Sequence, residues 1–201
     1  MEKLPLIDTA LKQDISALYG VAGRHYHGIS HIEALLALAC EYRWALADPE
    51  AIEAAIWFHD AVYDSRAKDN ETQSAALARE KLSGRVDTER LGHIVAMIEA
   101  TATHQLPKFA DPGTARDTAL FLDMDLSVLG AAPEVFAEYE RAVRQEYAWV
   151  PEPTWVAGRG AVLKNFLART SIFHTPEFRN RFEEQARINM GRSLVILEKQ
   201  A

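Results

Sequence analysis

The sequence lacks most of the features that mark secreted or membrane proteins. Its 201 residues include a single cysteine, Cys40, which has no partner within the chain for a disulfide bond. A disulfide-stabilised secreted framework is therefore excluded, and the expected setting is a reducing cytoplasm. No run of about 18 apolar residues occurs, so no membrane partner is expected. Residues 1–14 also lack the basic and then apolar layout of a signal peptide.

The sequence also has fewer basic than acidic residues. The chain has 29 acidic residues against 22 lysines and arginines, which gives a formal net charge of −7. This acidic balance provides no electrostatic footprint for sequence-independent binding along nucleic acid, so no nucleic-acid polymer is expected as a partner. The same net charge should repel phosphate-bearing ligands unless a local site offsets it.

Internal repeats, low-complexity tracts and Ser/Gly linkers are absent, and 48% of the residues are hydrophobic. A chain of this length can bury roughly 70% of the surface that its unfolded form exposes, so it needs neither disulfides nor a structural metal to fold. The sequence therefore predicts one globular domain over residues 1–201.

Apolar residues recur at helical spacing nearly throughout the chain, and no long stretch of strict apolar/polar alternation interrupts them. This pattern predicts an all-α fold, a helical bundle of about eight or nine helices. Most of the expected helices span 30–47, 49–62, 70–82, 88 to about 106, 114–129, 133–148, 155–170 and 176–197. The capping signals behind these bounds are Ser30 with Glu33, Asp48 before Pro49, Asn70, Asp87 or Thr88, and Thr175 before Pro176.

Two of these helices carry histidines on their apolar stripes. An ionisable group on a buried face is uncommon and needs a partner, so such positions are candidates for a functional site. His59 lies three residues after Ile56, which places it on the buried face at the end of its helix, with Asp60 beside it. His31 lies in the first turn of an earlier helix, in line with Leu35. The sequence thus brings imidazoles to two buried faces.

A third helix carries a carboxylate in the same kind of position. Asp125 lies three residues after Leu122 and four before Leu129 on an apolar stripe. Asp123 points roughly 200° away around the helix, so it is predicted to face solvent. A buried carboxylate without a partner is costly, and a cationic group should compensate Asp125.

These residues also have structural interpretations. A lone histidine on an apolar face is commonly a hydrogen-bonded core residue, and Asp125 could cap a neighbouring helix or pair with an arginine. The ordered set of His31, His59, Asp60 and Asp125 on different helices favours a metal site instead. Two imidazoles and two carboxylates suit Mn²⁺, Mg²⁺, Fe²⁺, Co²⁺ or Zn²⁺ and leave positions for water and substrate.

The order of these residues, H…HD…D on an all-helical scaffold, resembles the HD-domain superfamily of metal-dependent phosphohydrolases. Further stretches resemble one bacterial family of small stand-alone members, which are usually described as predicted metal-dependent phosphohydrolases. They are RHYHGISH (24–31), AIWFHDAVYD (55–64), KDNETQSA (68–75), TATHQ (101–105), FLDMDLSVLG (121–130) and the segment 144–178. The resemblance implies that His31, His59, Asp60 and Asp125 bind one divalent metal ion and that the protein hydrolyses a phosphoester or phosphoanhydride.

Residues beside the expected ligands have rival interpretations. Asp64, one helical turn beyond Asp60, is the candidate catalytic general acid/base, and its alternative is a cap for the loop that follows. Arg24 and His27 are candidates for binding substrate phosphate, and their alternative is a solvated basic turn.

Two further histidines lie between the HD pair and Asp125. His104 is a candidate for binding substrate or metal-bound water. His93 could share a face with it, as in dinuclear relatives of the superfamily, but His93 follows Gly92 on what the pattern indicates is an exposed face. A mononuclear site is therefore expected. In the C-terminal stretch, Arg144, Tyr147 and Arg159 are candidates for lining the pocket.

The function expected from this pattern is hydrolysis of a small phosphorylated molecule, such as a nucleotide, by a metal-activated water, as in a phosphatase or pyrophosphohydrolase. One alternative is a non-catalytic module that binds metal or nucleotide. Another is a di-iron oxygenase, since some HD-fold relatives use two irons. The expected location is the cytoplasm, and the pattern leaves the oligomeric state open, with a homodimer as one of the alternatives.

Overall fold

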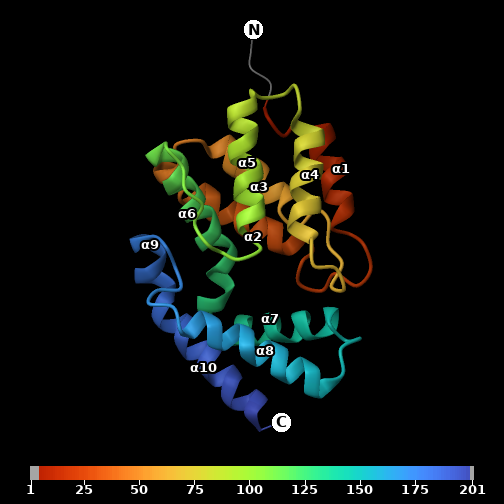
Figure 1. Ribbon diagram of the computed structural model, residues 1–201, viewed down its shortest axis with the longest axis vertical. Helices are drawn as coiled ribbons and strands as arrows, with labels where there is room; N and C mark the ends of the chain where they lie inside the picture. Colours follow the sequence, from red (N-terminus) through yellow and green to blue (C-terminus); the bar gives the residue numbers. More distant parts are fainter. Residues whose placement is uncertain (1–4, 200–201) are drawn as a thin grey trace. The chain divides into compact units, whose positions relative to one another are not determined.

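The computed structural model describes residues 5–199, which form helices joined by loops and contain no β-strand (Figure 1). The helices are α1 (Thr9–Leu18), α2 (Ile29–Glu41), α3 (Pro49–Phe58), α4 (Asn70–Leu82), α5 (Thr88–Ala100), α6 (Pro112–Leu126), α7 (Pro133–Glu146), α8 (Glu152–Leu167), α9 (Pro176–Phe178) and α10 (Glu184–Glu198). A π-helical segment, Arg179–Glu183, joins α9 to α10, so the described residues carry nine α-helices when 176–198 is counted as one. The predicted all-α class is confirmed.

Residues 1–4 and 200–201, the ends of the predicted domain and the start of the segment without signal-peptide features, lie outside the described residues. The chain divides into two compact units, with the division between Met124 and Asp125. The single domain over 1–201 stays a prediction, and each unit is described by itself. Among residues 5–199, no helix is both long and apolar enough to cross a membrane.

Helix α3 is the centre of the first unit. It packs against α1, α2, α4 and α5, and almost all of its residues are buried. Apart from the half-buried Glu53, every residue from Ala51 to Phe58 is buried, as expected for a helix in a core. Because α3 is enclosed in this way, the residue that follows its last turn, His59, also lies in the interior.

The beginning of α3 is held by carboxylates. The Asp48 side chain accepts a hydrogen bond from the backbone N–H of Ala51, which confirms the predicted helix start at Asp48-Pro49. Asp117 of α6 accepts from the backbone N–H groups of Ala47 and Asp48, at 2.8 and 2.7 Å. Arg90 of α5 binds the Asp48 carboxylate with two nitrogens, both at 2.6 Å. Three helices are thus tied together where α3 begins.

Two other predicted caps are confirmed, and two are wrong. Asp87 caps α5, and Thr175 caps the helix that begins at Pro176. The Ser30 capping box does not form, because α2 begins at Ile29 with Gly28 in the cap position, so Ser30 lies inside the helix. Asn70 is the first residue of α4 rather than its cap; its side chain instead makes two hydrogen bonds to the backbone of Asp64.

The helix predicted over 49–62 ends earlier, at Phe58. Side chains replace the helical hydrogen bonds beyond that point. The N–H of Val62 donates to the hydroxyl of Ser74, and that hydroxyl donates to the carbonyl of Val62. The next residues therefore form an irregular segment, 59–69, that leads to α4. The helix predicted over 30–47 also ends early, at Glu41, and a short 3-10 turn over 43–45 follows it.

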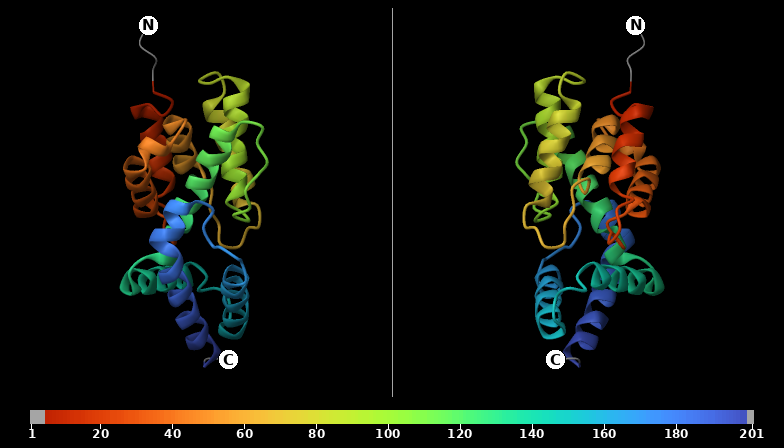
Figure 2. Two further views of the ribbon diagram at one scale, coloured as in Figure 1. Left: turned by 90° about the vertical axis from the view of Figure 1, so that its left-hand side faces the viewer. Right: turned by 90° about the vertical axis from the view of Figure 1, so that its right-hand side faces the viewer.

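The second unit contains α7, α8 and the helix over 176–198, and Figure 2 shows these helices from two sides. Helix α8 packs along α10, and the 3-10 turn over 127–130 packs against α10 and the π-helical segment. An ion pair between the buried Arg159 of α8 and the half-buried Glu140 of α7 links two of the helices. The unit has its own cluster of buried phenylalanines, Phe173 and Phe178, beside Phe182.

Candidate metal centre

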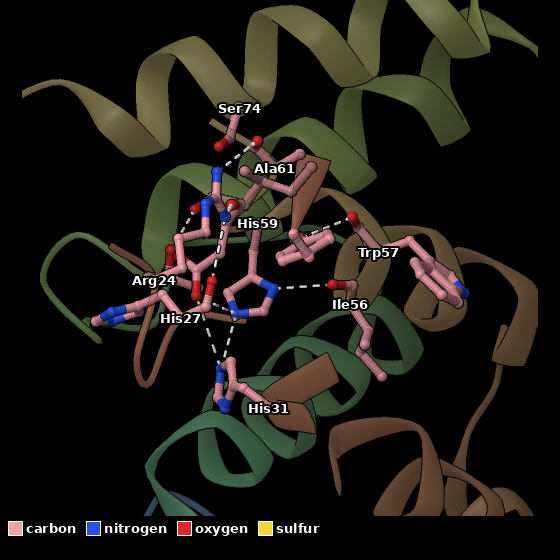
Figure 3. Close-up of polar contacts among 12 residues, drawn as sticks. Arg24, His27, His31, Ile56, Trp57, His59, Ala61 and Ser74 are labelled. Carbon is pink, nitrogen blue, oxygen red and sulfur yellow. Dashed lines mark hydrogen bonds and ion pairs between the residues drawn. The ribbon is translucent and has the colours of Figure 1, made fainter. Parts of the chain in front are cut away.

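His59 is held in one orientation by the end of α3. Its side chain is 1% exposed, and Nδ1 lies 2.9 Å from the carbonyl oxygen of Ile56 (Figure 3). A carbonyl oxygen can only accept a hydrogen bond, so Nδ1 carries the proton and Nε2 keeps its lone pair. A backbone carbonyl behind the ring is the usual way in which proteins fix a metal-binding histidine.

His31 faces the same point from the first turn of α2. It is also buried, and its Nε2 lies 3.2 Å from the Nε2 of His59. Two nitrogen ligands that bind one ion at about 2.0–2.1 Å lie roughly 3 Å apart. The separation of the two imidazole nitrogens therefore fits two ligands of a single ion.

Asp125 completes a group of three candidate ligands. It lies in the last turn of α6, and His31, His59 and Asp125 each offer one ligand atom within 4.8 Å of the others. Both histidines are buried and Asp125 is half-buried. These residues could hold a metal ion, as predicted from their order in the sequence.

Asp60, the fourth predicted ligand, lies outside that group but beside both histidines. Its Oδ2 is 3.2 Å from Nε2 of His59 and 3.7 Å from Nε2 of His31. Burial acts to raise the pKa of Asp60, but the neighbouring imidazoles of His59, His27 and His31 outweigh burial and hold the pKa below its usual range. Asp60 is therefore a carboxylate near neutral pH and supplies negative charge next to the two nitrogens.

The prediction that Asp123 faces solvent is wrong, because its side chain is fully buried. The prediction rests on an amphipathic helix with one wet face. In the structure, every residue from 117 to 124 is buried, so this part of α6 has no wet face. The angular separation between Asp123 and Asp125 still holds, and only Asp125 joins the two histidines.

Arg24 lies behind the turn that carries Asp60. Its Nη1 donates to the carbonyls of Asp60 and His27, at 2.6 and 3.2 Å, and Nη2 donates to the carbonyl of Ala61 at 2.9 Å (Figure 3). The guanidinium also lies over the rings of Tyr19 and Tyr63. Three of its five N–H groups are thus used inside the fold. Its predicted phosphate binding stays a prediction, whereas its contacts give it a positioning role.

Two tyrosines that the sequence analysis leaves out help to orient the histidines. The Tyr63 ring stacks on His27 with centroids 4.3 Å apart, and the Tyr26 ring lies 4.8 Å from that of His31. His27 is half-buried, and its charge acts on the pKa of Asp60. The only sequence signal for these tyrosines is their place inside the segments 24–31 and 55–64.

Asp64 occupies the loop rather than a helix. The expectation that it shares a face with Asp60 assumes a helix through residue 62, and α3 ends at Phe58. Asp64 is exposed, and its Oδ1 accepts a hydrogen bond from the N–H of Arg66 at 2.9 Å. This contact agrees with the loop-cap interpretation, and the general acid/base role stays a prediction.

His104 and His93 are not in the ligand group found among the described residues. His104 follows the end of α5 with a φ of 51°, and its N–H donates to the carbonyl of Ala100. A left-handed residue at this point is a common way to end a helix. His93 is half-buried, not exposed as expected, and lies edge-on to Phe109, with Nδ1 3.5 Å from the hydroxyl of Thr114.

Comparison of the chain with protein-family models, curated proteins and solved structures finds no match. The family resemblance drawn from the sequence motifs therefore remains an expectation. The case for a metal centre depends on the geometry of the chain's own residues.

Proposed function

We propose that this protein is a metal-dependent phosphohydrolase that acts on a small phosphorylated molecule. The observation that carries the proposal is the convergence of His31, His59 and Asp125 within 4.8 Å, with the Asp60 carboxylate beside both imidazoles. Two neutral nitrogens and two carboxylates form a mixed donor set that suits Mn²⁺, Mg²⁺, Fe²⁺, Co²⁺ or Zn²⁺. The order of these residues in the chain adds the resemblance to HD-type phosphohydrolases.

The roles of the ligands differ. The Ile56 carbonyl holds the His59 ring in one orientation, so Nε2 of His59 already faces the position of the ion. Asp60 and Asp125 supply the negative charge that offsets a divalent cation. A bound divalent ion contributes Lewis-acid chemistry, because it polarises a phosphoryl oxygen and makes water more acidic.

Phosphate binding must overcome the net charge of −7. Neutralisation of two carboxylates by the cation removes part of the local repulsion. His27, which stacks on Tyr63 near the turn that carries Asp60, is the residue that we assign to donate a hydrogen bond to the substrate phosphate. A nucleotide is the first substrate to test, because it joins a phosphate to a body large enough for further contacts.

The test measures metal content and phosphate release on the same preparations. Wild type purified without chelator is expected to contain about one equivalent of a divalent metal and to release phosphate from some members of a panel of nucleotides and p-nitrophenyl phosphate with added Mn²⁺. Asp60→Asn should lose most of both properties. Asp69→Asn, a change of the same kind at an exposed position of the loop over 59–69, should keep both.

Other outcomes identify the alternatives. Metal in the wild type without phosphate release above that of Asp60→Asn would replace the hydrolase with a binding module. Two irons per chain with a visible absorption band would favour oxidative chemistry. Equal metal content in wild type and Asp60→Asn would remove Asp60 from the ligand set.

A further inference from the structure

The second unit contains a cavity that the proposed metal chemistry does not use. Its volume is about 440 Å³, within the range of about 300–1,000 Å³ that is typical of small-molecule sites. Side chains of α7, the start of α8 and α10 line it, and Figure 2 shows these three helices. All of the lining residues lie between 133 and 197, so the cavity belongs to this unit alone.

The walls of the cavity are mainly apolar. Phe136 and Leu197 are buried at the wall, and Trp155 contributes a large aromatic surface. Ile196 also lines the cavity, although 58% of it is exposed. An exposed aliphatic side chain beside an apolar hollow favours a ligand with a hydrocarbon body, because binding would remove both surfaces from water.

The acidic residues of the lining are already neutralised within the fold. Glu140 pairs with Arg159 through one carboxylate oxygen and accepts a hydrogen bond from the Ser193 hydroxyl through the other, at 2.8 Å. Glu152 pairs with Arg144 at 2.7 Å. Neither carboxylate is left to repel an anion.

The remaining cations of the lining are Arg141 and Arg192. Arg141 has only a 3.8 Å contact with Glu138, and both side chains are more than 70% exposed, so the pair holds the guanidinium weakly. The Arg192 side chain is exposed, and it makes no ion pair or hydrogen bond among residues 5–199. The cavity therefore combines apolar walls with available guanidinium groups in a protein whose net charge is −7.

We propose that this cavity binds a small amphipathic anion, in which an apolar chain or ring lies against Phe136 and Trp155 and a single oxyanion head meets Arg192. A guanidinium fork matches both a carboxylate and a phosphate monoester, so the head group is one of these two. The site is independent of the proposed hydrolase activity, because none of its lining residues belongs to the candidate metal centre.

The experiment titrates the full chain with decanoate and with decyl phosphate below their micellar concentrations, followed by calorimetry. Decyltrimethylammonium, which has the same chain and the opposite charge, is the ligand control. The wild type should bind at least one of the two anions at a single saturable site, at least tenfold more tightly than the cation. The tighter anion identifies the head group.

Two variants locate the binding. Arg192→Gln removes the proposed contact with the head group and should weaken anion binding by about tenfold or more, since hydrogen bonds to charged groups are the strong ones. Ala137→Phe places a large side chain at an exposed lining position and should abolish binding. Arg79→Gln and Ala76→Phe make the same changes at exposed positions of α4 and should bind as the wild type does.

The proposal fails if neither anion binds saturably, or if decyltrimethylammonium binds as tightly as the anions. It also fails if Arg192→Gln keeps the affinity of the wild type within twofold. Because Arg192 is exposed, this variant is expected to fold, as a thermal melt would verify, and the test does not depend on the behaviour of Ala137→Phe.

Discussion

Single atoms decide whether the candidate centre can bind a metal ion. Nδ1 of His59 lies against a backbone carbonyl, so the lone pair remains on Nε2, 3.2 Å from Nε2 of His31. Two imidazole nitrogens brought so close need either a shared proton or a shared cation. The charged Asp60 carboxylate beside both nitrogens favours a cation in this space.

The first prediction compares two carboxylates of one helix. Asp125→Ala should lose tight metal binding, because Asp125 is the residue of α6 that joins the histidine pair. Asp123→Asn should keep metal content near that of the wild type, although Asp123 is buried and its replacement should lower the thermal stability. Metal analysis after dialysis against a weak chelator measures the difference. Equal metal loss in both variants would contradict the assignment.

The burial of Asp123 also shows where residue-level inference from sequence stops. The spacing of Leu122, Asp125 and Leu129 correctly singles out Asp125. Whether the opposite side of the same helix meets water depends on what packs there, and helical phase holds no information about that packing. The same limit applies to Arg24, whose three carbonyl partners become neighbours only in the folded chain.

The second prediction concerns Arg24 as a positioning residue. Lysine cannot reproduce a planar fork that reaches the carbonyls of His27, Asp60 and Ala61, so Arg24→Lys should shift the turn that carries Asp60. Metal affinity should fall by about tenfold or more, as is typical when the support of a ligand is lost. Competition with a fluorescent chelator measures the affinity, and Arg79→Lys on α4 is the control. An unchanged affinity in Arg24→Lys would assign Arg24 a purely structural role.

At the scale of helices and turns, contacts with other elements decide where a helix ends. The sequence places the starts of α3, α5 and the segment over 176–198 correctly, because a side chain of the cap residue itself accepts the backbone N–H. It misses the end of α3 at Phe58, because Arg24 and Ser74 bind the backbone beyond that point. Local sequence patterns predict the helices well, but they miss helix ends that depend on side chains distant in the sequence.

The third prediction tests a close approach between two elements of the second unit. A Cβ on Gly130 would lie 2.5 Å from the carbonyl oxygen of Phe182 and 2.9 Å from its Cα. The π-helical segment must move to accommodate it, so Gly130→Ala should lower the free energy of unfolding by about 1–3 kcal/mol. Urea unfolding followed by circular dichroism measures this change.

The matched control for that prediction is Gly158→Ala on α8, where no atom lies within 4 Å of an added Cβ. Here alanine should raise the free energy of unfolding by about 0.5–1 kcal/mol, because it favours the helix. If both variants are destabilised to the same extent, the close packing of Gly130 on Phe182 does not account for the effect.

At the scale of the whole molecule, the net charge of −7 does not describe the local charge at the two proposed sites, which differ in sign. The candidate metal centre gathers carboxylates that a cation would neutralise. The cavity of the second unit has its carboxylates paired and keeps guanidinium groups available. The composition predicts a protein that repels anions, and both anion sites proposed above depend on local groups that offset this net charge.

The last prediction concerns where in the chain metal binding slows amide exchange. His31, His59 and Asp60 belong to the unit that ends at Met124, and Asp125 is the first residue of the other unit. A metal ion at about 100 times its dissociation constant stabilises the state that binds it by about 2.7 kcal/mol, which slows by about 100-fold any amide exchange that requires release of the ion. Exchange should therefore slow in α2, α3 and the last turn of α6, which carry or adjoin the candidate ligands, whereas α8 and α10, which carry none of them, should exchange as they do without metal. Hydrogen exchange of the full chain with and without added metal measures this, and Asp60→Asn should abolish the difference. Equal slowing in α8 and α10 would contradict a local effect of the ion and would favour the single cooperative domain that the sequence predicts.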